Sequence, residues 1–262
     1  MNRLNRGRMR RAYAGQSVRA RTGGTWRGIA TTLVIGLNGL AAGCGTAGER
    51  LPDFRYRLTV EVQTPEGLRR GASVIEVRSW RTGTVAVEPN TLRHRVDGEA
   101  VAVDLGARGT LYAVLRSDDF EGLASELPYL LIRQDVPPGT DHHGERMRRV
   151  QQLRGRLPVP RQLEMSNARF ETYPILVRFR DPADPRTVQR VNPDHLAAGF
   201  GPGVALHSIT LEPTQEPVTH GIRKRLPWLG DQPEPSLYGP YRPTATPTLA
   251  QLLTFGDFSR RQ

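Results

Sequence analysis

Residues 54–80 have the sequence FRYRLTVEVQTPEGLRRGASVIEVRSW, and this stretch decides the fold class. In residues 54–63 apolar side chains fall at every second position, which is typical of a strand with one buried face. Thr64-Pro-Glu-Gly67 follows, with proline and glycine placed as in a tight turn. Residues 72–80 form a second apolar run, so the sequence predicts a β-hairpin over 54–80.

Working outward, the strand pattern continues along the chain. Further strands are predicted at 84–88, 99–105, 110–115, 174–180 and 203–212. Gly106–Gly109 links two of them as another hairpin, so residues 54–116 are expected to form an antiparallel sheet.

Helical patterns are shorter and fewer. Leucines from Leu123 to Leu131 have helical spacing, with 117–119 as a cap and Pro128 as a kink or a late start. Residues 145–153 predict a second short helix. Asn192-Pro193 predicts a third, ending at Gly199. Prolines in 155–172 favour irregular chain. Taken together, the predicted strands and helices indicate an α+β fold, an antiparallel β-sheet with a few short helices.

The composition changes near residue 230. Prolines punctuate 230–247, which predicts an extended, mobile stretch that buries little, and 249–255 predicts a short docked helix. The expected organisation is a signal peptide (1–43), a tether (44–53), a globular domain (54–229) and a Pro-rich C-terminal extension with a possible short terminal helix (230–262).

The N-terminal segment has the layout of an export signal. Residues 1–28 carry eight arginines and no acidic residue, and residues 29–42 (IATTLVIGLNGLAA) carry no charge. A basic segment, a short apolar run and small residues at a cleavage point are typical of a secretory signal. The apolar run is shorter than the roughly 20 residues of a membrane span.

Cys44, the single cysteine, closes the run Leu40-Ala-Ala-Gly-Cys44. These five residues resemble the lipobox of a bacterial lipoprotein precursor, although leucine stands one place earlier than usual. The resemblance implies cleavage before Cys44, a diacylglycerol on its thiol and a membrane anchor. Since Gly45 follows where aspartate would signal inner-membrane retention, it also implies the outer membrane, facing the periplasm. The alternatives are an ordinary secretory signal, a signal anchor and a cytoplasmic protein.

Net charge argues against nucleic acid as a partner. The whole chain has a formal charge of +11, but residues 44–262 hold 29 basic and 26 acidic residues, a net charge of +3. A nucleic-acid footprint should lie on the folded domain. Here the excess lies mainly on the segment expected to be removed.

Motifs exclude several kinds of enzyme. The sequence contains no Gly-x-x-x-x-Gly-Lys-Ser/Thr, Gly-x-Ser-x-Gly, His-Glu-x-x-His or Gly-x-Gly-x-x-Gly. Its one lysine, Lys224, lies between arginines, which argues against a P-loop or a lysine Schiff base. An acylated Cys44 cannot serve as a nucleophile.

The densest group of potential metal ligands is Asp141-His-His-Gly-Glu145. His142, His143 and Glu145 are weak candidates for zinc, because their spacing matches no standard motif. The alternative is a solvated loop and helix cap. We expect no metal and no cofactor.

Other candidate positions have ordinary explanations beside the functional ones. Three carboxylates are candidates for binding a cation or for acid–base catalysis: Asp181, Asp184 and Asp194. The alternative is that they form ordinary turns. The glycine-rich run Gly199–Gly203 is a candidate phosphate-binding turn, and the alternative is a helix end. The basic stretch Gly221–Trp228 is a candidate contact for anionic lipid, and the alternative is a solvated surface. The remaining scattered histidines of interest are His94, His195, His207 and His220.

Three stretches, 56–67, 200–212 and 216–228, resemble an uncharacterised group of proteobacterial proteins, a resemblance that brings no activity. The sequence therefore predicts a membrane-tethered lipoprotein with a structural, assembly or binding role. Its candidate partners are the membrane, through the lipid anchor, and an envelope protein. Whether it is an enzyme stays uncertain, with a non-enzymatic role favoured. The alternative is a periplasmic hydrolase or metal-dependent enzyme, and a small-ligand-binding lipoprotein is a third.

Overall fold

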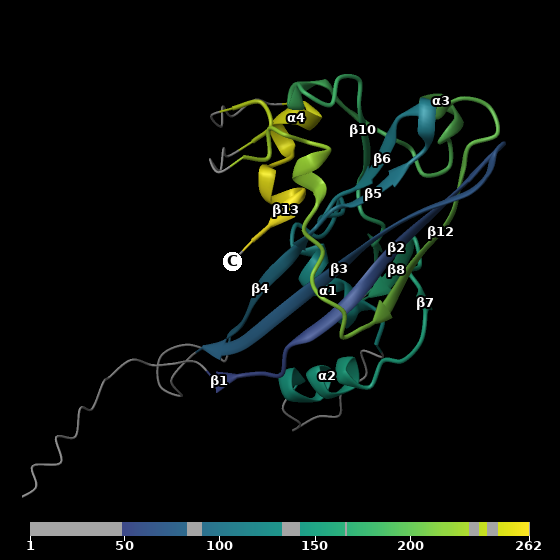
Figure 1. Cartoon of the computed structure of the whole chain (residues 1–262). Helices are drawn as coiled ribbons and strands as arrows, with labels where there is room; N and C mark the ends of the chain where they lie inside the picture. The colour runs from purple at the N-terminus through teal and green to yellow at the C-terminus, as the bar shows by residue number, and fades with distance from the viewer. Residues whose placement is uncertain are drawn as a thin grey trace, which may run out of the picture. The chain divides into compact units, whose positions relative to one another are not determined.

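A long β-hairpin forms the centre of the structure, a computed structural model (Figure 1). Strand β2 (Phe54–Thr64) pairs antiparallel with β3 (Gly67–Thr82) along its whole length, so the predicted hairpin and its turn are confirmed. The structure describes residues 49–82, 91–132, 142–165, 167–230, 236–239 and 246–261, all within the unit Gly45–Gln262. The predicted strand 84–88 and the residues up to 48, Cys44 included, lie outside them.

The hairpin belongs to a large antiparallel sheet with the strand order β13-β4-β3-β2-β12-β7, and β1 pairs with β3 beyond the end of β2. The remaining strands of this sheet are β1 (Glu49–Arg50), β4 (Thr91–Glu99), β7 (Leu157–Pro158), β12 (Ala205–Pro213) and β13 (Ser259–Arg260).

A smaller antiparallel sheet has the order β11-β10-β6-β5, and β8 and β9 form a separate hairpin. These strands are β5 (Val101–Asp104), β6 (Thr110–Ala113), β8 (Gln162–Met165), β9 (Ala168–Glu171), β10 (Leu176–Phe179) and β11 (Val188–Arg190). The helices are α1 (Leu123–Leu130), α2 (His142–Gln151), α3 (Ala197–Phe200) and α4 (Leu249–Leu252), with short 3-10 turns η1 (Gly106–Arg108), η2 (Pro185–Thr187), η3 (Ile222–Lys224) and η4 (Phe255–Asp257). The described chain is therefore mostly antiparallel β-sheet with short helices, compatible with the expected α+β class. Residues 54–116 do not form one sheet, however, because β2–β4 belong to the large sheet and β5–β6 to the small one.

Two glycines allow close backbone contacts where the large sheet meets the small one. Gly98, at the end of β4, has a φ of 152°, and a Cβ there would meet the Ile75 side chain at 3.0 Å. At Gly71 a Cβ would lie 2.2 Å from the Ala102 carbonyl oxygen. No side chain fits at Gly71, so only glycine lets β3 and β5 approach this closely.

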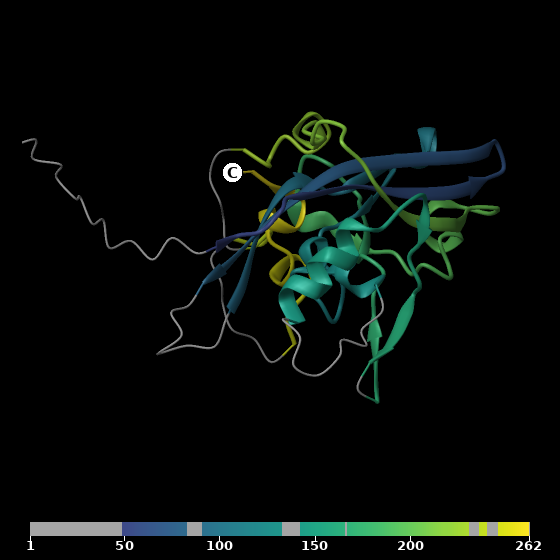
Figure 2. The same ribbon diagram turned by 90° about the horizontal axis from the view of Figure 1, so that it is seen from below.

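The first core lies between the inner face of the large sheet, one face of the small sheet, and helices α1 and α2, which Figure 2 shows on that side of the large sheet. Alternate residues of β2 supply its centre, with Tyr56, Val60 and Val62 all at 0% exposure. The period-2 pattern of the sequence therefore corresponds to real burial.

Helix α1 contains Pro128, which cannot donate a backbone hydrogen bond to the carbonyl four residues earlier. That carbonyl, on Ala124, instead accepts a hydrogen bond of 2.7 Å from the Tyr56 hydroxyl. The buried tyrosine thus satisfies a helix carbonyl that the proline leaves open. The expected cap at 117–119 is wrong: the N-cap is Gly122, which has no side chain to cap the helix.

The second core lies on the other face of the small sheet and uses the C-terminal end of the chain. Phe258, at 0% exposure, packs with Tyr112 and Phe179, and β13 pairs with β4. Helix α4 lies within the predicted 249–255. Leu237, in the expected mobile stretch, is only 3% exposed, because its N–H bonds to the Leu253 carbonyl at 2.9 Å and its side chain enters this core.

Two local predictions are wrong. Residues 155–172 are not wholly irregular but contain β7 and the β8–β9 hairpin, whose strands of two to four residues are too short for their apolar alternation to be a clear signal. The helix expected from Asn192 begins only at Ala197, because the Asn192 side chain accepts the Asp194 N–H at 2.9 Å and forms a turn instead. In the described part of the chain, every helix is too short or too polar to cross a bilayer.

Candidate functional site

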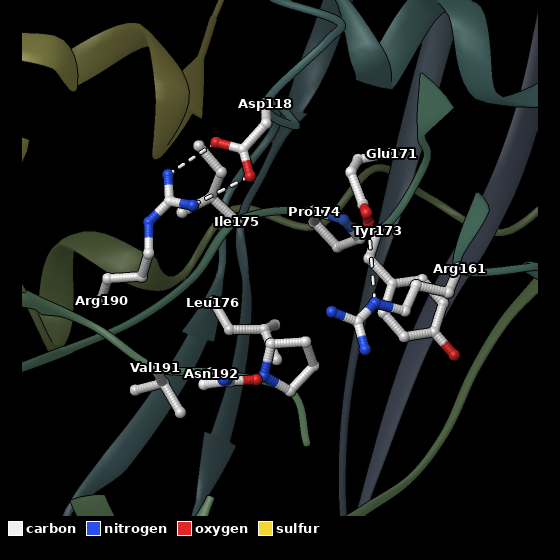
Figure 3. A pocket seen from close by; sticks show the side chains of 11 residues that line it. Asp118, Arg161, Glu171, Tyr173, Pro174, Ile175, Leu176, Arg190, Val191 and Asn192 are labelled. Carbon is white, nitrogen blue, oxygen red and sulfur yellow. Dashed lines mark hydrogen bonds and ion pairs between the residues drawn. The ribbon is translucent and has the colours of Figure 1, made fainter. Parts of the chain in front are cut away.

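A pocket of about 410 Å³ lies where the ends of β9, β10 and β11 meet (Figure 3). Four charged side chains from separate segments surround it. Asp118 follows β6, Arg161 precedes β8, Glu171 ends β9 and Arg190 ends β11. The small sheet and the β8–β9 hairpin therefore place these residues together across more than 70 positions of sequence.

Asp118 and Arg190 form a two-pronged ion pair on one side of the pocket. The Arg190 Nη1 donates to Asp118 Oδ2 at 2.8 Å, and Nη2 donates to Oδ1 at 2.7 Å (Figure 3). This guanidinium holds the pKa of the Asp118 carboxyl below its usual value. Asp118 therefore stays ionised near neutral pH and has no proton to give as a general acid.

Arg161 occupies the opposite side and is also paired. Its guanidinium contacts the Asp194 carboxylate, and its Nε lies 3.7 Å from Glu171 Oε2. The Glu171 N–H in turn donates to Asp119 Oδ2 at 2.6 Å, which fixes the end of β9 against the loop after β6. Of Asp181, Asp184 and Asp194, only Asp194 contacts a residue of this pocket, through its ion pair with Arg161, and it does not itself line the pocket.

The floor between the two ion pairs is apolar. Leu176 and Val191 are 2% and 5% exposed and belong to the first core. Tyr173 lies beside them, and burial raises the pKa of its hydroxyl. A neutral tyrosine hydroxyl is a poor nucleophile but a good hydrogen-bond donor.

Among the described residues that line the pocket there is no histidine, serine, threonine or cysteine. The wall combines two guanidinium groups, held by carboxylates, with an apolar floor and one tyrosine hydroxyl. Such a wall suits recognition of a polar group, since each guanidinium keeps N–H donors that its carboxylate partners do not use.

A second polar cluster lies inside the first core, beneath α1 and α2. Ser79 Oγ is 2.8 Å from His94 Nδ1, and the His94 ring lies 5.5 Å from the Tyr129 ring. Burial lowers the pKa of His94, and the guanidinium of Arg146 lowers it further. The histidine is therefore neutral near pH 7.

The Ser79–His94 pair has the residue types of an activated nucleophile but not its surroundings. Ser79 is 0% exposed, and within the described ranges no carboxylate hydrogen-bonds to the His94 ring. A serine nucleophile must reach its substrate, and its histidine needs an orienting group. The pair is accordingly a satisfied buried hydrogen bond.

The candidate metal residues lie at the start of α2. His142 is its exposed first residue, and Glu145 is paired with Arg148 and Arg149, each at 2.9 Å. These i, i+3 and i, i+4 pairs use both carboxylate oxygens within the helix. In the described residues no three His, Cys, Asp or Glu side chains gather as metal ligands, and His143 joins no such group.

Asp181 and Asp184 stabilise turns. Asp181 accepts the Ala183 N–H at 2.9 Å, and Asp184 caps η2 by accepting the Arg186 N–H at 3.0 Å. Both carboxylates are therefore satisfied locally, as Asp-Pro turns commonly are.

Gly199–Gly203 ends α3 and leads into β12, and Gly201 has a φ of 94°. Trp228, at the end of the basic stretch, packs against Phe258 and donates from Nε1 to the Pro182 carbonyl at 2.9 Å. Its ring therefore belongs to the second core. His195 is exposed, and His220 lies 3.6 Å from Asp97.

Sequence reasoning missed the charged pair that defines the pocket. The local pattern suggests a helix cap at Asp118, and Arg190 is the last residue of a three-residue strand that follows a loop. No local signal joins residues 72 positions apart. Comparisons with models of known families, with curated proteins and with solved structures found no match, so the site is interpreted from its own geometry.

Proposed function

We propose that this chain is the precursor of a bacterial lipoprotein, anchored through an acylated Cys44, whose folded domain is a non-enzymatic binding or assembly module of the cell envelope. Support for the anchor comes from the basic segment, the uncharged run and the residues Leu40 to Cys44. The proposed location is the outer membrane, facing the periplasm, since Gly45 follows the cysteine.

The observation that carries the binding role is the Asp118–Arg190 pair at the pocket. The carboxylate is held in its charged form, so it has no proton to donate as a general acid and instead fixes the guanidinium in place. A guanidinium oriented in this way beside an apolar floor can offer its remaining N–H groups to a polar group on a ligand or partner. We therefore assign the pocket to recognition.

The anchor is tested by detergent phase separation and mass spectrometry of the protein from a Gram-negative host. Wild type should enter the detergent phase and carry a diacylglycerol on Cys44, because two acyl chains hold a protein stably on a membrane. The Cys44→Ala variant should stay unprocessed and unlipidated. Wild-type protein without lipid would disprove the anchor, and movement of Gly45→Asp to the inner membrane would support the outer-membrane location.

The pocket is tested by a photo-crosslinking side chain placed at Asn192, an exposed lining residue, in living cells. We expect one adduct of defined mass, lost when Arg190→Glu reverses the charge beside the pocket. Position Arg169, exposed on the β8–β9 hairpin, provides the control. The same adducts at both positions, or an adduct that is insensitive to Arg190→Glu, would count against recognition at this pocket.

A further inference from the structure

The large sheet begins close to the proposed anchor. Strand β1 starts at Glu49, which pairs with Arg81 near the end of β3. From Cys44 to Glu49 the chain advances five residues, and a fully extended chain spans at most about 3.3–3.6 Å per residue. Acylation of Cys44 would therefore hold this end of the sheet within about 18 Å of the membrane.

The outer face of the same end carries arginine and tryptophan. Side chains alternate across a strand, and residues in register share a face. Trp80 of β3 is flanked by Arg50 of β1 and Arg93 of β4. In the next row on this face, Arg78 is opposite Arg95. We call these five residues the arginine–tryptophan face.

The positive charge of this face is partly neutralised at Arg50, which pairs with Asp53 at 2.8 Å, and within the described ranges it lies mainly on Arg93 and Arg95. Farther along the strands, the following row on the same face contains Glu76 beside Asp97. Arg78 donates to Glu76 at 2.6 Å, so part of its charge is neutralised there. Arg93 and Arg95 are exposed, and across the described part of the chain no carboxylate forms an ion pair with either.

Trp80 is placed as an amphipathic side chain at an interface. Its ring is half-buried, and the guanidinium of Arg95 lies 5.6 Å from the ring centroid. Tryptophan is enriched at membrane–water boundaries, where one part of the ring is apolar and the other wet. The other described tryptophan, Trp228, is also half-buried, but its ring packs against Phe258 at the second core.

We propose that the arginine–tryptophan face lies against anionic phospholipid headgroups, an inference that rests on the proposed acylation of Cys44. The lipid anchor supplies attachment, and the face sets the orientation of the domain. Each arginine near an anionic surface contributes an affinity gain of roughly fivefold, equivalent to about 1 kcal/mol. The exposed pair Arg93 and Arg95 therefore supplies the main attraction.

The experiment uses the processed, acylated protein in vesicles of phosphatidylcholine with about 30 mol% phosphatidylglycerol. A spin label near the lipid headgroup should quench Trp80, and the quenched component should be absent in Trp80→Phe. Charge reversal by Arg93→Glu with Arg95→Glu should lower this quenching at least about twofold. Vesicles of phosphatidylcholine alone, or salt well above physiological strength, should lower it similarly.

The matched control reverses two exposed arginines elsewhere, Arg148 and Arg169, whose side chains are 67% and 65% exposed. That variant has the same net charge and should keep the wild-type quenching of Trp80. Equal quenching in all variants, or none in wild type bound to vesicles, would overturn the membrane assignment.

Two other outcomes are distinguishable. If Cys44 carries no lipid and the protein does not float with vesicles, the proposed function and this inference fail together. If the acylated protein floats but Trp80 is shielded only at high protein density, the face contacts a second copy of the chain. That result is compatible with the acylation of Cys44 and refutes the contact between the arginine–tryptophan face and the lipid headgroups.

Discussion

Replacing Phe258 with alanine should destabilise the whole domain. Phe258 is 0% exposed, and its ring centroid lies 5.7 Å from Phe179, 5.5 Å from Trp228 and 6.5 Å from Tyr112. Its carbonyl also accepts the Ala100 N–H at 2.8 Å, at the corner where the two sheets meet. The side chain therefore joins the C-terminal end of the chain to the small sheet.

The expected cost follows from this environment. Phenylalanine to alanine in a core costs about 3–5 kcal/mol, from lost burial and from the cavity left behind. Each favourable ring pair adds about 0.5–1.5 kcal/mol beyond burial, which favours the upper part of that range. Since domains are stable by about 5–15 kcal/mol, we expect a loss near 4 kcal/mol and a clear fall in the urea midpoint.

Urea unfolding of the purified protein, followed by tryptophan fluorescence, measures this loss. Trp228 reports on the second core and Trp80 on the large sheet, so coincident transitions indicate one cooperative unit. The control is Leu252→Ala in α4, a leucine 44% exposed, which should cost less than about 1 kcal/mol. A loss below about 1 kcal/mol for Phe258→Ala would refute the packing of residues 246–261 on the domain.

Three further predictions concern single features. Gly71→Ala should lower stability by about 2 kcal/mol or more in thermal unfolding, because its Cβ would lie 2.2 Å from the Ala102 carbonyl oxygen; an unchanged melting temperature would contradict the close approach. Asp118→Asn should cost less than about 1 kcal/mol at pH 7, since its ion pair with Arg190 is half exposed. The pKa of Asp118 is lowered by folding, so this difference should shrink as pH falls below about 4 and vanish once the carboxyl is protonated. EDTA should leave the melting temperature unchanged and the purified protein should hold less than about one zinc per chain; stoichiometric zinc lost in His142→Ala would promote the metal-enzyme alternative.

Much of the fold could be predicted from local pattern. The β2–β3 hairpin followed from alternation, which places every second residue on the buried face, and from a turn whose proline and glycine fit its geometry. Strand β12 and helix α2 were found near their observed positions for the same reason. The β8–β9 hairpin could not be predicted with the same ease, because each of its strands has only four residues and the alternation of Leu163 and Met165 is too short to stand out.

The candidate site could not be predicted in this way. Hydrophobic periodicity records only whether a residue faces a core, whereas an ion pair depends on which segments the topology brings together. Asp118 and Arg190 meet because β10 pairs with both β6 and β11, and neither residue carries a local sign of that pairing. The same reasoning applies to the arginine–tryptophan face, whose members come from three strands.

The sequence by itself determined the hairpin, the antiparallel class and the hypothesis of a lipid anchor at Cys44, because turn chemistry, alternation and an export signal are all encoded within short stretches. Only the tertiary structure decided that the C-terminal end closes a second core and that Leu237 belongs to it. It also decided that the Tyr56 hydroxyl donates to the Ala124 carbonyl, which Pro128 leaves without a helical donor. These two partners are 68 residues apart in the sequence. These contacts join distant segments, and their free energy exists only once the chain has folded.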